Sequence, residues 1–216
     1  MIARSARGPR RDTYRHGDLR RALTEAAMEL ARRSGPDAVV VREATRRVGV
    51  APNAAYRHFA DRRALLEAVC AMAWSKIALA MEAELATLPP HTDSTPARRA
   101  RARLGAIGGA YLRFAQAEPG LFRTAYSIPA DMARATNPDR AGASGLTPFQ
   151  MLAAALDELT EARLLPAERR PGAEFVAWAA VHGLAVLLVD GPLRGLEPSA
   201  RADIGRRILD MLNNGL

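Results

Sequence analysis

The chain is poor in the residues that build disulfides and metal centres. Its 216 residues include one cysteine, Cys70, so no disulfide can form within the chain. The four histidines, His16, His58, His91 and His182, stand in unrelated contexts, and no cysteine and histidine cluster has the spacing of metal ligands. The sequence therefore predicts no bound metal and no other cofactor.

Recognisable catalytic arrangements are missing as well. No serine, cysteine or carboxylate stands beside a histidine in a known catalytic motif. The glycine-rich segment 105–109 falls within a predicted helix and follows no strand, so it does not fit a nucleotide-binding loop. It is better explained by close helix packing or a kink. We therefore expect a protein that is not an enzyme.

Long hydrophobic runs are also absent. The longest, residues 175–189, is shorter than the roughly 20 apolar residues that a bilayer-spanning helix needs, and it contains His182. The basic segment 1–11 is not followed by an apolar run, so it does not resemble a secretory signal. These features predict a cytoplasmic protein that does not bind membranes.

Charge of one sign is concentrated at one end of the chain. Residues 1–63 contain fifteen arginines and seven acidic residues, which accounts for the whole net charge of +8. Residues 64–216 are neutral. This asymmetry indicates a module that binds a polyanion, joined to a neutral body. A solubilising charged face is the alternative explanation.

Apolar residues recur at helical spacing along the chain, and no segment alternates convincingly as a strand does. Gly35-Pro36 ends the first helix, Gly49 ends the second, and Asp61 is a candidate N-cap for a long fourth helix. Residues 88–96 and 128–146 have the composition of a linker and a long loop. The sequence thus predicts an all-α fold of about nine helices, at 17–33, 41–48, 52–59, 62–86, 97–117, 119–126, 147–163, 171–189 and 199–213.

Two short helices joined by a glycine turn, between longer ones, are typical of a helix-turn-helix. If 52–59 is helical, Ala55 and Phe59 point toward the core, and Asn53, Tyr56 and Arg57 lie on the opposite face. Arginine can bind guanine and asparagine can bind adenine in the major groove of double-stranded DNA. A solvated polar face explains the charges equally well.

Residues 17–69 resemble the DNA-binding domain of the TetR family of regulators. The family pattern is a Gly-Val turn, a short helix with Tyr-x-x-Phe, a basic residue three positions later and a leucine three further on. Gly49-Val50, Tyr56, Phe59, Arg62 and Leu65 match it.

The sequence departs from the family pattern at three places. Val40 replaces a frequent serine or threonine cap, Ala44-Thr45 replaces a larger apolar residue followed by alanine, and Arg62 replaces a common lysine. The resemblance implies that Tyr56, His58 and Arg62 contact DNA phosphates. It also implies that Asn53, Ala54 and Arg57 contact bases. Arg42 and Thr45 are further expected DNA contacts.

The composition of the N-terminus and the family resemblance together predict three parts of the chain. We expect a flexible basic arm at 1–14, a helix-turn-helix DNA-binding domain at 15–62, and a helical ligand-binding and dimerisation domain at 63–216. The arm is either disordered or contacts the minor groove or phosphates through Arg7, Arg10 and Arg11.

Residues 175–189 are apolar on every face of a helix, so all sides need cover. The last helix carries a second apolar stripe. A four-helix dimer interface would cover the apolar surfaces of both helices. The alternative is that both helices pack within the core of a single chain. The predicted interface residues are Val181, Leu184, Leu188, Ile204, Ile208, Met211 and Leu212.

Trp178, His182 and Gly183 resemble a Trp-His-Gly motif that characterises one C-terminal subclass of these regulators. His182 either lines a ligand cavity or is a core histidine bonded to a backbone carbonyl. The candidate pocket consists of Tyr111, Phe114, Phe122, Tyr126, Phe149, Trp178 and His182, with Met132 and Met151.

These observations predict a ligand-responsive DNA-binding regulator, most often a repressor that a small molecule releases from a palindromic operator. Its partners are a second copy of the chain, operator DNA and an unknown small-molecule effector. The alternative is a non-specific architectural DNA-binding protein. The neutral segment 64–216 argues against that alternative, because such proteins spread basic residues over their surface.

Overall fold

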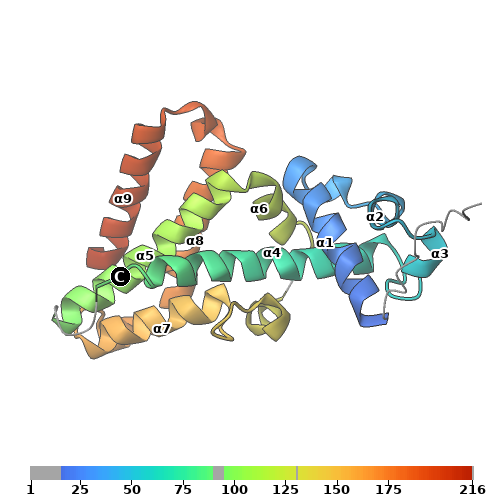
Figure 1. Ribbon diagram of the computed structural model, residues 1–216. Helices are drawn as coiled ribbons and strands as arrows, with labels where there is room; N and C mark the ends of the chain where they lie inside the picture. Colours follow the sequence, from blue (N-terminus) through green and yellow to red (C-terminus); the bar gives the residue numbers. More distant parts are fainter. Residues whose placement is uncertain (1–15, 90–94, 130, 216) are drawn as a thin grey trace, which may run out of the picture.

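The computed structural model describes residues 16–89, 95–129 and 131–215, and the predicted basic arm at 1–14 lies outside these ranges. The described residues are mainly helical and contain no strand, which confirms the all-α prediction (Figure 1). The α-helices are α1 (His16–Ser34), α2 (Val41–Val48), α3 (Pro52–Ala55), α4 (Arg62–Leu85), α5 (Pro96–Ala117), α6 (Pro119–Ala125), α7 (Pro148–Glu161), α8 (Ala173–Val189) and α9 (Pro198–Gly215).

The helices α1, α2 and α3 form the N-terminal unit, around a core that includes Leu23, Ala44 and Phe59. Gly49 caps α2 with φ at 75°, a left-handed conformation in which glycine costs least. Val40, at the start of α2, makes no side-chain cap, as its side chain predicts. The chain therefore turns sharply between α2 and α3.

The helix α3 is shorter than the predicted segment 52–59, because the chain leaves regular helix after Ala55. The amides of His58 and Phe59 both donate to the carbonyl of Ala55, at 2.9 Å each. This turn keeps Phe59 buried, and the guanidinium of Arg20 lies over its ring at 4.6 Å from the centroid.

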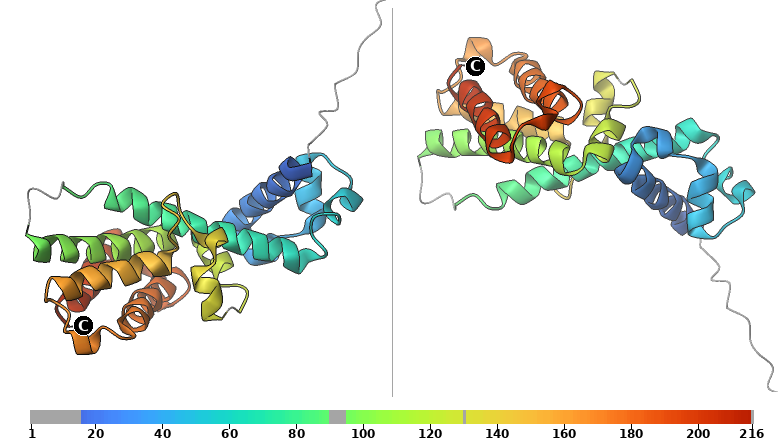
Figure 2. Two further views of the ribbon diagram at one scale, coloured as in Figure 1. Left: turned by 90° about the horizontal axis from the view of Figure 1, so that it is seen from below. Right: turned by 90° about the horizontal axis from the view of Figure 1, so that it is seen from above.

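The helix α4 is the longest element and joins the two ends of the molecule (Figures 1 and 2). Its 24 residues span about 36 Å at 1.5 Å per residue. The predicted cap is confirmed, since the Asp61 carboxylate accepts from the amide of Ala64 at 2.8 Å. The helix is long and apolar enough to cross a membrane, but half of that window is buried inside the protein, as in a core helix.

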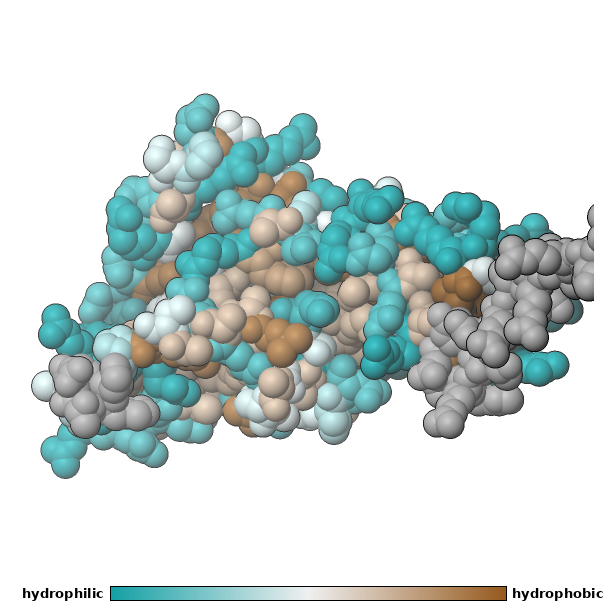
Figure 3. All heavy atoms as spheres, viewed as in Figure 1, coloured by the Kyte–Doolittle hydropathy of each residue, from teal (hydrophilic) through white to brown (hydrophobic). Residues whose placement is uncertain are grey.

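The helix α5 lies at the centre of the C-terminal part and packs against α4, α7, α8 and α9. On the face shown in Figure 3, apolar residues follow the middle of the molecule and hydrophilic residues follow the upper rim. The predicted domain boundary at residues 62 and 63 stays a prediction, because α4 packs against helices of both parts.

The predicted loop at 128–146 contains two 3-10 turns, η3 (Met132–Thr136) and η4 (Pro138–Arg140). Its end is held by α4, because the Glu82 carboxylate accepts from the amides of Ala143 and Ser144 at 2.9 Å each, and from the Ser144 hydroxyl. Burial raises the pKa of the Glu82 carboxyl, but these hydrogen bonds outweigh it and lower the pKa overall.

Four of the predicted dimer residues are wrong as interface residues, because they are buried within the single chain. These are Val181, Leu184, Leu188 and Leu212, whereas Ile204 and Ile208 are half-buried and Met211 is exposed. A helix that is apolar all round gives no sequence signal for which side faces inward. The outer side of α8 instead exposes Phe175, Val176, Val186 and Leu187.

The helix α6 connects the two parts through a close contact with the end of α1. Arg32 on α1 donates to the carboxylate of Glu118 at 3.0 Å. Gly120 faces the carbonyl oxygens of Ala31 and Arg32 so closely that a Cβ atom at this position would overlap both. A side chain at residue 120 would therefore push the backbones of α1 and α6 apart.

We expect Gly120→Ala to destabilise the protein by about 1–3 kcal/mol, because the overlapping atoms are backbone and cannot rotate away. The matched control is Gly105→Ala on α5, where the nearest atom to an added Cβ is 4.0 Å away. That control should be neutral or stabilising by up to about 1 kcal/mol. Urea unfolding followed by circular dichroism measures both changes, and equal stability of the two variants would contradict the contact.

Candidate nucleic-acid interface and ligand cavity

The surface of α3 and the turn after it carries the side chains predicted to read bases. Asn53, Tyr56 and Arg57 are exposed, and Ala54 and His58 are half-buried. Ala55 and Phe59 face the core with 1% and 2% of their surface exposed. The arrangement therefore offers a guanidinium, an amide and a phenol on one side, groups that suit a major groove.

The helix α2 contributes less to this surface than the sequence predicts. Arg42 is exposed. Thr45 is buried, and its hydroxyl donates to the carbonyl of Arg42 at 2.8 Å. The predicted DNA contact by Thr45 is therefore wrong, because the residue shares the inward side of α2 with Val41 and Ala44.

Part of the positive charge on α2 is neutralised within the helix. The carboxylate of Glu43 accepts from Arg46 at 2.7 Å and from Arg47 at 3.2 Å. The Arg46 hydrogen bond is the main cause that lowers the pKa of Glu43 to about 2, so this carboxylate stays charged at neutral pH. Arg42 and Arg57 are also exposed on the surface of α2 and α3. Among the described residues, no carboxylate lies within 4.0 Å of either guanidinium.

Arg62 has a structural role that the sequence did not reveal. Its guanidinium donates to the carbonyls of Val39 at 2.8 Å and Pro36 at 2.9 Å, and lies 3.8 Å from the Asp37 carboxylate. These contacts tie the start of α4 to the connection between α1 and α2. The side chain is still 47% exposed, so the phosphate contact stays a prediction beside this second role.

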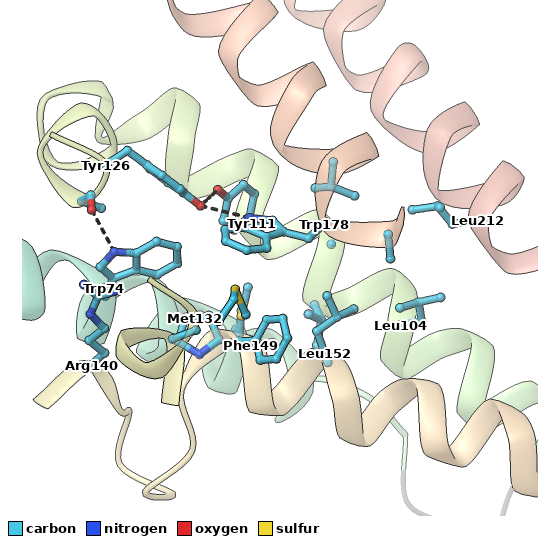
Figure 4. Close-up of a pocket in the computed structure, with 18 of the residues that line it drawn as sticks. Trp74, Leu104, Tyr111, Tyr126, Met132, Arg140, Phe149, Leu152, Trp178 and Leu212 are labelled. Carbon is cyan, nitrogen blue, oxygen red and sulfur yellow. Dashed lines mark hydrogen bonds between the residues drawn. The ribbon is translucent and has the colours of Figure 1, made fainter. Parts of the chain in front are cut away.

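A cavity of about 240 Å³ lies between α4, α5, α7, α8, α9 and the segment after α6 (Figure 4). Its wall is mostly apolar and carries five aromatic rings, from Trp74, Tyr111, Tyr126, Phe149 and Trp178. A cavity lined by rings with few polar groups suits a mainly hydrophobic small molecule.

Part of this wall was predicted from the sequence. Tyr111, Tyr126, Phe149, Trp178 and Met132 line the cavity. The predictions for Phe114, Phe122, Met151 and His182 are wrong, because these residues do not line it. Phe122 and His182 lie one layer behind the wall, with ring centroids 5.8 Å and 6.3 Å from that of Tyr111. Apolar periodicity predicts burial, and it does not tell a cavity wall from the layer behind it.

A partly buried chain of hydrogen bonds supports the aromatic wall. The hydroxyls of Tyr111 and Tyr126 are hydrogen-bonded to each other, and Trp178 Nε1 donates to the Tyr126 hydroxyl at 3.2 Å. His182 Nδ1 lies 2.9 Å from the Tyr111 hydroxyl. His182 is thus half-buried and bonded to a tyrosine hydroxyl, where the core alternative expected a backbone carbonyl.

Burial keeps this network uncharged. It lowers the pKa of His182, which favours the neutral imidazole. It also raises the pKa of Tyr111 and of Tyr126 above the usual value for tyrosine. At neutral pH the network therefore offers hydrogen bonds to a ligand but no charge.

Trp74 and Arg140 are cavity residues that the sequence analysis missed. Trp74 Nε1 donates to the carbonyl of Ala125 at 2.9 Å, and its ring centroid lies 4.8 Å from that of Tyr126. Arg140, at the end of η4, lies over the Trp74 ring. Trp74 occurs in the apolar stripe of α4 and Arg140 in a predicted loop, so no local pattern marks either one.

An N-terminal helix-turn-helix and a C-terminal helical domain with an internal cavity, joined by one long helix, define a class of DNA-binding transcription regulators. Residues 23–69 match the model described as bacterial regulatory proteins of the tetR family, and residues 104–212 match the tetracyclin repressor-like C-terminal domain. The chain belongs to the TetR family, which confirms the resemblance seen in the sequence.

Solved structures of similar fold cover nearly the whole chain. A protein of unknown function from Rhodococcus sp. RHA1 is 27% identical, with a TM-score of 0.70, and covers 94% of this chain and 98% of its own. FadR from Bacillus subtilis, solved with stearoyl-CoA, is 13% identical with a TM-score of 0.64 over 91% of this chain and 98% of its own.

A third similar structure is a TetR variant from Acinetobacter baumannii AYE in complex with minocycline. It is 18% identical, with a TM-score of 0.56, and covers 89% of this chain and 93% of its own. Among proteins with curated descriptions, none matches the chain.

We expect Arg57→Ala and Arg62→Ala to weaken DNA binding in different ways. Loss of Arg57 should cost roughly 1–3 kcal/mol per half-site and relax preference at one base pair, because an exposed guanidinium reads a base edge. Loss of Arg62 should weaken all sequences alike, reduce the salt slope by about one per half-site and also lower stability, because its bonds to Pro36 and Val39 are lost.

Fluorescence anisotropy with operator and scrambled duplexes at several salt concentrations separates these effects. Arg206→Ala on α9 is the control and should change neither property. Unchanged base preference in Arg57→Ala would show that the assignment of the reading face is wrong.

Proposed function

We propose that this protein is a homodimeric repressor that binds a palindromic operator in double-stranded DNA and leaves it when a small molecule fills the cavity. One observation carries the proposal: α4 begins at Arg62, which holds the helix-turn-helix, and forms the cavity wall further along with Trp74 and Met81. One rigid helix therefore touches both sites.

The coupling follows from the geometry of operator binding. Two recognition helices read a palindrome only when their separation matches about one helical turn of DNA, near 34 Å. A ligand that displaces α4 at Trp74 also moves the end that carries Arg62. The required coupling free energy is modest, about 1–3 kcal/mol.

The contact between α1 and α6 offers a second connection. The carbonyl of Ala125, at the end of α6, accepts from Trp74, and Tyr126 follows directly in the cavity wall. The same helix meets α1 through Glu118 and Gly120. Movement of the wall can therefore reach the helix-turn-helix by two routes.

Similar proteins support a small-molecule effector. FadR was solved in complex with stearoyl-CoA and a TetR variant in complex with minocycline, and both share this fold. We propose accordingly a cytoplasmic regulator without enzymatic activity and without a cofactor. An architectural protein that binds DNA without sequence preference would lose all sites together as salt rises, whereas a regulator retains one tight site.

We expect a dimer of about 47 kDa, twice the chain mass of 23.3 kDa, in light scattering at micromolar concentration. The exposed side of α8 is the proposed contact, with Val176 59% exposed. Val176→Glu should produce monomers, because a charge would be buried in an apolar contact. Leu146→Glu, on an exposed loop position, is the control and should stay dimeric. A wild-type monomer that still protects a palindrome would contradict this interface.

We expect operator DNA and effector to weaken each other's binding by the same factor, between about fivefold and 150-fold. The operator comes from selection of bound genomic fragments. Candidate compounds are those that change tryptophan emission, because both tryptophans of the chain, Trp74 and Trp178, line the cavity. Calorimetric titration of each compound with and without operator measures the factor. Equal affinity in both titrations would mean that the compound is not the signal.

A further inference from the structure

Arg140 is a cation in the wall of an otherwise apolar cavity. It is half-buried, and its guanidinium carbon lies 5.5 Å from the centroid of the Trp74 ring. Among the residues that the structure describes, no carboxylate comes within 4.0 Å of its guanidinium and no acceptor is hydrogen-bonded to it. Its guanidinium instead makes a cation–π contact with the ring of Trp74.

Three other half-buried arginines of the C-terminal part each have a carboxylate within 4.0 Å. Arg103 pairs with Glu158 at 2.8 Å, and Arg170 pairs with Asp157 at 2.7 Å. Arg134, six residues before Arg140, lies 3.7 Å from Glu67. Withdrawing a charge from water is costly unless a partner compensates it, so a half-buried arginine without a protein acceptor is available to pair with an anion that enters the cavity.

The electrostatic surroundings agree with this reading. Burial lowers the pKa of Arg140, and repulsion by Arg134 lowers it further. The groups that raise the pKa are the Cys70 thiol and the Tyr126 hydroxyl, and neither is a carboxyl group. Arginine nevertheless stays charged in proteins, so the cation remains and lacks a counter-charge.

The segment that carries Arg140 is held in place at both ends. Asn137 caps η4 by accepting from the amide of Asp139 at 2.9 Å. Beyond Arg140, the Glu82 carboxylate binds the amides of Ala143 and Ser144. The backbone that carries Arg140 is therefore held before any ligand arrives, which reduces the entropy that binding must overcome.

The cavity has a charged end and an apolar end. Figure 4 shows Arg140 beside Trp74 at one end, with Leu104 and Leu212 toward the other and the aromatic side chains between them. Asp131 also lines the cavity, and its carboxylate accepts from the amide of Arg134 at 3.3 Å. One cation can neutralise one negative charge, and the Asp131 carboxylate disfavours a ligand with a second.

We propose that the cavity binds a hydrophobic monocarboxylate, with the carboxylate paired to Arg140 and the apolar body extending toward Leu104 and Leu212. The planar guanidinium matches a carboxylate in two parallel hydrogen bonds. The Tyr111 and Tyr126 hydroxyls are the polar groups available along the body of the ligand. The role of this acid as the effector rests on the proposed function. Its binding in the cavity is independent of that function.

Quenching of tryptophan emission in the full-length protein tests the charge preference. The probes are two matched pairs, decanoate with decanamide and 2-naphthoate with 2-naphthamide, which differ in charge but share a body. We expect at least one acid to bind about tenfold or more tightly than its amide, the factor that a charge-assisted hydrogen bond supplies.

Three variants identify the cation responsible. Arg140→Met should reduce the affinity of the acid to that of its amide, while Arg140→Lys should retain most of the preference. Arg134→Met is the matched control, because Arg134 belongs to the same segment but does not line the cavity, and it should retain the full preference. Circular dichroism confirms that each variant is folded.

The proposal is overturned if the amides bind as tightly as the acids, if Arg140→Met keeps the preference, or if none of the four probes binds up to millimolar concentration. A gel-shift experiment with operator separates this inference from the proposed function. An acid that binds through Arg140 without releasing DNA supports the cavity assignment and counts against that acid as effector. Neutral compounds that release DNA equally from wild type and Arg140→Met support the regulator and contradict the inference.

Discussion

The packing of α4 against two separate groups of helices is the constraint on which the other features depend. Its first turns are fixed by the Asp61 cap and by the bonds of Arg62 to the carbonyls of Pro36 and Val39. Its middle supplies Trp74 to the cavity and its end supplies Glu82 to the loop at 143–144. Since α4 is hydrogen-bonded along its length, one stiff element connects all of these contacts.

The cavity combines hydrophobic walls with a small number of directed polar groups. Tyr111, Tyr126, Trp178 and His182 are hydrogen-bonded to one another, so their partly buried polar atoms have partners. Arg140 does not share in that network. Under the binding mode proposed above, a wall whose uncharged polar groups are paired, and whose cation is not, selects a ligand by its charge as well as by its shape.

The connection between α1 and α6 requires close approach of two backbones. Glycine at 120 is needed there because any Cβ would overlap the carbonyl oxygens of Ala31 and Arg32 near the end of α1. The Arg32–Glu118 pair holds the same junction at 3.0 Å, where both side chains are about one-third exposed. A partly exposed ion pair of this kind contributes little stability by itself, and the backbone contact sets the geometry.

Local chemistry in the sequence determined the helices and the family of this protein. Glycines with left-handed φ, the Asp61 cap and apolar spacing depend on near neighbours along the chain, so the bounds of α2 were predicted as observed and those of α4 to within one residue. The outward position of Arg57 and the inward position of Phe59 followed from the same periodicity.

Only the tertiary structure decided which apolar side chains face a cavity, a core or a partner. Leu184 and Leu188 share α8 with Val176 and Leu187, and the sequence pattern is the same on all sides of that helix. Thr45 is buried because α1 and α3 pack over α2, and Arg62 binds backbone carbonyls more than twenty residues away. Arg140 meets Trp74 only through the folded loop. Contacts between residues far apart in sequence leave no periodic signal, so these placements required the folded chain.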